Sequence, residues 1–165
     1  MRILLQRVTG ASVTVDDVVV GKIERGLTLL VGITGQDSDD DLVALASKVV
    51  NLRIFEADAG KMNLSALDLL QSGTPMGMLV VSQFTLYGDV RKGRRPSFTD
   101  AARPEQAAPM IERFAGLLCD MGFQVAQGTF GAHMMVSLTN DGPVTIWIDS
   151  DDLRQPRRGE AVPVT

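Results

Sequence analysis

Residues 140–145 read NDGPVT and lie between two runs of alternating apolar and polar residues. Proline fixes its own φ and glycine permits positive φ, so this segment is conformationally constrained. It carries no strong nucleophile or general base. A rigid polar segment of this kind is better suited to recognising or excluding a ligand than to attacking one. A plain hairpin turn is the competing interpretation.

The flanking runs, 134–138 and 144–148, alternate with the period of a β-strand and predict an antiparallel pair joined by this loop. Other strands are expected earlier in the chain. They are 11–15, a turn at 16–17 into 18–20, a buried strand over 27–33, and a short buried strand over 78–81.

Two amphipathic helices are predicted. One begins at the acidic residues 39–41 and continues to Leu52, and the other begins at Pro104 and ends near Gly122. Cys119 on the second helix is interpreted as a buried thiol. Residues 56–77 contain several glycine and proline breakers and are expected to be irregular.

These elements predict one α+β domain, a curved, mainly antiparallel, barrel-like sheet with two packed helices. A chain of 165 residues with 45% hydrophobic and 22% charged residues is sufficient for one such core. We assign residues 1–150 to this domain and residues 151–165 to a polar C-terminal tail.

Composition excludes several classes of function. No apolar run approaches the roughly 20 residues of a membrane span, so no membrane partner is expected. One Cys and one His argue against a zinc site, and the single Cys fits a reducing, cytoplasmic location. The net charge of −4 does not indicate a nucleic-acid binder as a whole.

Chemistry is expected at residues 82–85, where polar side chains of Ser82, Gln83 and Thr85 follow a buried strand. A hydroxyl nucleophile needs an adjacent base, and nothing orients the only histidine, His133, toward this segment. The competing interpretation is a hydrogen bond within a turn.

Two further groups of residues could bind a ligand. Phe130 and Met134 could line an adenine-sized pocket, although packing in the core explains them equally well. A basic run could bind phosphates, although a solvated turn is its alternative. Its members are Arg91, Lys92, Arg94 and Arg95, with Arg103 nearby.

Taken together, these segments resemble the D-aminoacyl-tRNA deacylase family. Residues 82–87 match its Ser-Gln-x-x motif, and residues 140–145 match its Asn-x-Gly-Pro-x-Thr motif. The resemblance covers roughly residues 1–150 and departs from the family at His133. Further matches are 6–8, 11–13, 51–55, 61–63, 91–98 and 130–132.

The resemblance implies a homodimer without metal or cofactor, which hydrolyses the ester joining a D-amino acid, or mischarged glycine, to the 3′ end of tRNA. Asn140, Gly142 and Pro143 would form the selective segment, with a cis bond reaching into the partner subunit's pocket to exclude L-amino acids. Phe130 and Met134 would hold the terminal adenine.

The resemblance also implies that Ser82, Gln83, Phe84 and Thr85 form the catalytic segment. Backbone donors near Phe84 and Thr85 would stabilise the oxyanion, while the 2′-hydroxyl of the terminal ribose assists. In the alternative mechanism, Thr85 is the nucleophile. Two other functions stay open, a nonenzymatic RNA-binding dimer and a general esterase that acts on small substrates.

Overall fold

The structure is a computed structural model that describes residues 1–57 and 60–155. Within these residues the chain forms eight strands and four α-helices, together with the 3₁₀ helix η1 (Phe84–Tyr87). The strands are β1 (Arg2–Val15), β2 (Val18–Ile23), β3 (Gly26–Gly32), β4 (Phe55–Glu56), β5 (Met62–Leu64), β6 (Gly77–Ser82), β7 (Gln124–Gln127) and β8 (Met135–Asp149). The helices are α1 (Asp39–Asn51), α2 (Ala66–Gln71), α3 (Pro104–Asp120) and α4 (Ser150–Arg154).

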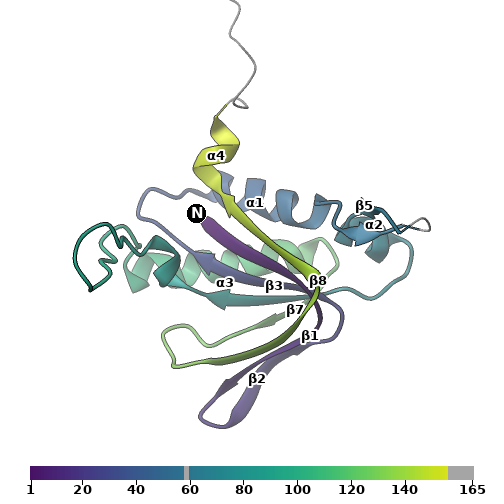
Figure 1. Ribbon diagram of the computed structural model, residues 1–165, viewed down its shortest axis with the longest axis horizontal. Helices are drawn as coiled ribbons and strands as arrows, with labels where there is room; N and C mark the ends of the chain where they lie inside the picture. The colour runs from purple at the N-terminus through teal and green to yellow at the C-terminus, as the bar shows by residue number, and fades with distance from the viewer. Residues whose placement is uncertain (58–59, 156–165) are drawn as a thin grey trace, which may run out of the picture.

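Six of the strands form one curved sheet (Figure 1). Its central path is β2-β1-β3-β6-β7, and β8 pairs with the other edge of β1. The pairs of β1 with β2, β3 and β8 are antiparallel, whereas β6 is parallel to both β3 and β7. The α+β class and the mainly antiparallel, curved sheet are therefore confirmed.

The sheet nearly closes on itself because β2 returns against β7. Gly21 of β2 permits this approach, since a Cβ at that position would lie 2.6 Å from the backbone oxygen of Gln127. Only a residue without a side chain allows the two backbones to come so close.

The main core lies between the sheet and the helices α1, α2 and α3. Successive residues of β6 face opposite sides, so Met78 and Val80 join this core while Leu79 and Val81 join a second cluster with β1 and β2. Because β6 is buried on both faces, it has the continuous apolar sequence expected of a central strand. Its C-terminal end is therefore held rigidly.

The predicted hairpin around residues 140–145 is wrong. Residues 135–138 and 144–148 do not pair with each other, because they belong to the two halves of the single strand β8, 15 residues long. Both halves pair with β1, which is itself 14 residues long and provides one continuous edge. The register shifts opposite Arg7 and Thr9, so the Gly-Pro segment is a bulge within a strand and not a turn.

Two other expectations need correction. Residues 56–77 are not irregular, since they contain part of the small β4-β5 pair and α2. Cys119 is exposed because it lies on the solvent side of α3, beside buried Leu118. The polar tail over 151–165 stays a prediction: its first residues belong to the helix α4, and residues 156–165 lie outside the described residues.

Candidate functional site

The Ser82–Thr85 segment begins where β6 ends and η1 starts. The backbone N–H of Gln83 donates to the carbonyl of Val31 at 2.7 Å, which extends the pairing of β6 with β3 by one residue. The chain then turns into η1, and the N–H of Gly88 closes this turn on the Thr85 carbonyl at 2.9 Å. These bonds fix the position of the polar segment at the end of a buried strand.

Thr85 is exposed, and its hydroxyl accepts a hydrogen bond from the Gln83 side-chain amide. No carboxylate or imidazole contact to this hydroxyl is recorded among residues 1–57 and 60–155. An amide N–H cannot remove a proton, so Gln83 orients the Thr85 hydroxyl without activating it.

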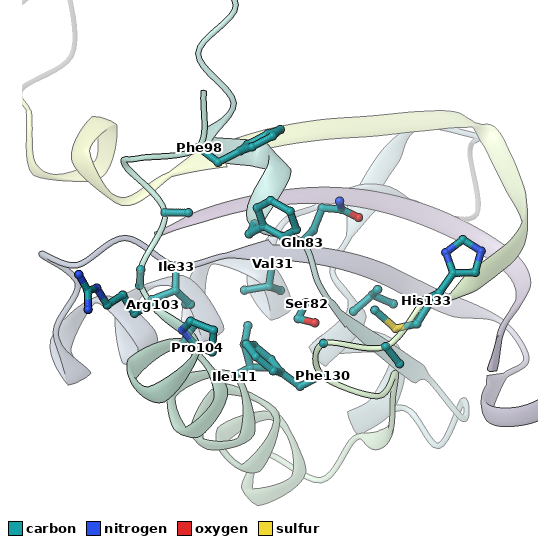
Figure 2. Close-up of a pocket in the computed structure, with 18 of the residues that line it drawn as sticks. Val31, Ile33, Ser82, Gln83, Phe98, Arg103, Pro104, Ile111, Phe130 and His133 are labelled. Atoms are coloured by element: carbon teal, nitrogen blue, oxygen red, sulfur yellow. The ribbon is translucent and has the colours of Figure 1, made fainter. Parts of the chain in front are cut away.

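A cavity of about 590 Å³ opens beside this segment. Figure 2 shows Ser82, Gln83 and Phe130 around it, with Phe98 above and α3 below. The complete lining is mostly apolar. It consists of Val31, Ile33, Val81–Phe84, Phe98, Ala101–Pro104, Ala107, Ile111, Phe130–Met134 and Val136.

The structure thus brings together five of the residues singled out in the sequence, namely Ser82, Gln83, Phe84, Phe130 and Met134. The two aromatic side chains are partly exposed at its surface, 57% for Phe84 and 40% for Phe130. Open aromatic faces beside an apolar cavity can stack on a planar ring such as a nucleobase. His133 is also part of the lining.

The basic loop is attached to the same cavity. Asp89 and Ser97 exchange two backbone hydrogen bonds, at 2.8 and 2.9 Å, and thereby close a loop that extends from the body of the domain. The next residue, Phe98, packs edge-on against Phe84 with ring centroids 5.0 Å apart. Because Phe98 also lines the cavity, this contact anchors the base of the basic loop at the cavity.

Within this loop the four cations are not equivalent. Arg91 forms a two-pronged ion pair with Asp89, at 2.9 and 2.7 Å. The side-chain hydrogen bonds from Arg91 lower the pKa of Asp89 to about 2. No ion pair is recorded for Lys92, Arg94 or Arg95 within the described part of the chain, and all three are exposed. The positive charges of these three side chains are therefore accessible to an anionic ligand.

The bulge at residues 140–145 is held by its own polar side chains. The Asn140 side-chain amide donates to the Thr145 hydroxyl at 2.8 Å, and its carbonyl oxygen accepts from the Val144 N–H at 3.0 Å. The Gly142-Pro143 peptide bond is cis, and both residues are exposed. The Asn and Thr of the motif therefore brace the segment, while its central pair faces outward.

Arg7 supports the same bulge from below, a role that the sequence reasoning missed. Its side chain is buried, with only 6% exposed. It donates to the carbonyls of Ile54 and Asp141, the latter at 3.1 Å, and forms an ion pair with the Asp141 carboxylate at 3.2 Å. The sequence did contain an indication of this role, because Arg7 is a charged residue directly before Val8 in a largely apolar strand. A charge that is buried in such a strand requires hydrogen-bond or ion-pair partners.

The two motifs do not meet within one chain. Ser82 pairs with Val31, Val31 with Ile3 and Ile3 with Ile148, so Ser82 and Ile148 occupy one row of the sheet. Gly142 lies six residues before Ile148. With strand spacings of about 4.8 Å and a rise of about 3.3 Å per residue, the separation is on the order of 20 Å. Neither Gly142 nor Pro143 lines the cavity described above.

No helix in the described ranges is long and apolar enough to cross a membrane.

Comparison with known proteins places these features in context. The profile of the D-Tyr-tRNA(Tyr) deacylase family matches residues 4–149. The D-aminoacyl-tRNA deacylase of Thermomicrobium roseum is 57% identical over 93% of this chain and 97% of its own length. That of Chloroflexus aurantiacus is 55% identical over 96% of each chain.

Two solved structures have a similar fold. The c-Myc DNA unwinding element binding protein superposes with a TM-score of 0.82 at 38% identity, covering 90% of this chain and 98% of that one. A probable eukaryotic D-amino acid tRNA deacylase has a TM-score of 0.74 at 21% identity, covering 89% and 97%, which supports the fold alone.

Proposed function

Because the chain belongs to the D-Tyr-tRNA(Tyr) deacylase family, whose enzymes hydrolyse the ester bond of aminoacyl-tRNA, we propose that it removes D-amino acids and mischarged glycine from tRNA in a homodimeric site. The observation that carries this proposal is the separation of the two motifs. The cavity beside Ser82 lacks the rigid Gly-Pro segment, and that segment lies exposed elsewhere on the same chain.

In this proposal, Gly142 and Pro143 of one subunit reach into the cavity of the partner subunit. Asn140, Thr145 and Arg7 support the segment, because their hydrogen bonds hold its backbone in one arrangement. A rigid backbone rejects an L-side chain by steric overlap and admits a hydrogen or a D-side chain that points elsewhere. Specificity then comes from exclusion and needs no attractive contact to the side chain.

The terminal adenine lies against Phe130 and Met134, which border an apolar cavity of sufficient size. The acceptor stem passes the exposed cations Lys92, Arg94 and Arg95, whose loop is attached to that cavity through Phe98. Because these contacts are made to phosphates, they position any tRNA without reading its sequence.

Hydrolysis is assisted by the RNA. Phe84 and Thr85 begin η1, where backbone N–H groups lack a partner inside the helix and can stabilise a developing oxyanion. The 2′-hydroxyl of the terminal ribose takes part in place of a protein nucleophile. Thr85 as nucleophile is the alternative, and the amide contact from Gln83 argues against it because an amide is not a base.

The direct test gives the purified protein D-Tyr-tRNA and L-Tyr-tRNA in parallel. We expect the D-ester to be hydrolysed well above the buffer rate and the L-ester to remain intact. If neither ester is hydrolysed faster than in buffer, the proposed enzyme activity fails, which favours the alternative of a nonenzymatic RNA-binding dimer. Hydrolysis of simple D-amino acid esters without tRNA would instead indicate a general esterase.

Mixing two impaired variants tests whether the site is shared. Gln83→Ala damages the cavity segment, and Gly142→Ala damages the bulge. In a mixed dimer with sites built from both subunits, one site contains an intact cavity and an intact bulge, so activity returns. If each chain forms its own site, both sites stay damaged and mixing restores nothing.

A further inference from the structure

A second cavity, of about 360 Å³, adjoins the first. The two share three lining residues, Ser82, Ile111 and Phe130, so the Phe130 side chain borders both. Figure 2 shows Phe130 and Ile111 together below Ser82, between the end of β6 and α3. The volume falls in the range of about 300–1,000 Å³ that is typical of small-ligand sites.

The second cavity has a different chemical character from the first. Glu112 lines it from α3 and Gln127 from the last position of β7. Both residues are exposed, and neither side chain has a hydrogen bond or ion pair recorded within the described residues. The cavity therefore offers one carboxylate acceptor and one amide that can donate or accept.

A carboxylate in this position disfavours a phosphate and favours a group that donates hydrogen bonds. The exocyclic amino group of cytosine is such a donor, and carboxylates accept from it in base recognition. The neighbouring N3 and O2 of cytosine are acceptors, which the Gln127 amide can satisfy. Uracil presents a carbonyl oxygen where cytosine has the amino group. This oxygen and the Glu112 carboxylate are both hydrogen-bond acceptors, so they would repel each other.

We propose that the second cavity binds the cytosine base of the nucleotide that precedes the terminal adenosine of tRNA, with Glu112 and Gln127 reading its edge. This inference rests on the proposed function, which places the terminal adenine against Phe130 in the first cavity. Consecutive nucleotides then occupy the two cavities that Phe130 separates. Because every tRNA ends in cytidine-cytidine-adenosine, a site for this cytosine serves all of them.

The test compares two D-tyrosyl-tRNAs, acylated chemically, that differ only in cytidine or uridine at this position. We expect kcat/KM to fall roughly tenfold with uridine, the size of one base-edge contact. Equal kcat/KM values for the two tRNAs would overturn the inference while leaving the proposed function intact. If neither tRNA is hydrolysed, the proposed function itself fails.

Glu112→Gln sharpens the test because an amide can accept from cytosine or donate to uracil. This variant should distinguish the two tRNAs by no more than about twofold. The matched control is Glu105→Gln, which removes the same charge from the same face of α3 about 10 Å away. The control should keep the tenfold preference, and an unchanged preference in Glu112→Gln would contradict the assignment.

Discussion

Replacing Gly142 with alanine tests how rigidly the bulge of β8 is held. Gly142 has a φ of +119°, a conformation that L-residues rarely adopt. A Cβ at this position would lie 2.7 Å from the Nη2 atom of Arg7 and 3.0 Å from Cγ2 of Val144. Arg7 cannot move aside freely, because its other nitrogens bond the carbonyls of Ile54 and Asp141.

The expected cost has two sources. Holding alanine in a sparsely populated backbone conformation costs about 1–3 kcal/mol. Displacing the buried guanidinium from one carbonyl costs about 1.5–3 kcal/mol, the usual value for a hydrogen bond to a charged group. If the bulge stays in place, the free energy of unfolding falls by about 2.5–6 kcal/mol, and Tm falls by about 5–25 °C.

Two measurements follow, thermal unfolding and single-turnover hydrolysis of D-Tyr-tRNA. A bulge that shifts to relieve the overlap lowers Tm less but lowers the hydrolysis rate by tenfold or more, since misplacement by about 1 Å costs about a hundredfold. The matched control is Gly73→Ala, which also places alanine at positive φ, +87°, but meets nothing within 4 Å. Its free energy of unfolding should fall only by the backbone cost of about 1–3 kcal/mol, and it should keep full activity.

One result refutes this reasoning. If Gly142→Ala has both the Tm and the D-Tyr-tRNA rate of the unchanged protein, then the contacts around Gly142 neither hold the bulge nor matter to the substrate. A large loss of activity in Gly73→Ala would show that alanine at any glycine with positive φ has the same effect. The effect of Gly142→Ala could then not be attributed to its contacts with Arg7 and Val144.

Three further predictions concern the bulge support, the nucleophile and the basic loop. Arg7→Lys keeps the charge but cannot reach two carbonyls at once, so we expect urea unfolding to show a loss of about 1–3 kcal/mol, with weaker discrimination between D- and L-Tyr-tRNA; unchanged values would contradict the role of Arg7. Thr85→Ala should keep most of the hydrolysis rate if the RNA assists, whereas complete loss with intact tRNA binding would identify Thr85 as the nucleophile. Arg94→Ala should reduce the slope of log Kd against log salt by about 1, because its charge is free for a phosphate. Arg91→Ala should change this slope less, because in the unchanged protein the charge of Arg91 is already paired with Asp89. Arg91 holds the pKa of Asp89 at about 2, so this carboxylate stays ionised and paired until the pH falls toward that value. Equal slopes for the two variants would contradict this distinction.

Local patterns predicted most individual elements correctly. The acidic start of α1 and Pro104 at the start of α3 are where the sequence places them. The turn at Asp16 and Asp17 has positive φ at both residues, as a tight hairpin requires. These features depend on interactions within a few residues, which a single sequence displays directly.

Long-range pairing was not predictable in the same way. The two alternating runs around residues 140–145 fit a hairpin by their spacing, but the long edge of β1 provides a better partner for both. Likewise, helical spacing placed Cys119 near an apolar face, while the packing of α3 leaves it exposed. In both cases the outcome depends on surfaces contributed by distant segments.

The same distinction applies to the candidate site. The sequence by itself determined the family motifs, the polar segment at the end of a buried strand that we propose to be catalytic, and the constrained Gly-Pro pair. Only the tertiary structure decided that Phe130 and Met134 share a cavity with Ser82, that buried Arg7 supports the bulge, and that the bulge lies far from the cavity. The physical reason is that backbone conformation and side-chain chemistry are local properties, whereas burial, strand pairing and distance across a sheet depend on how the whole chain packs.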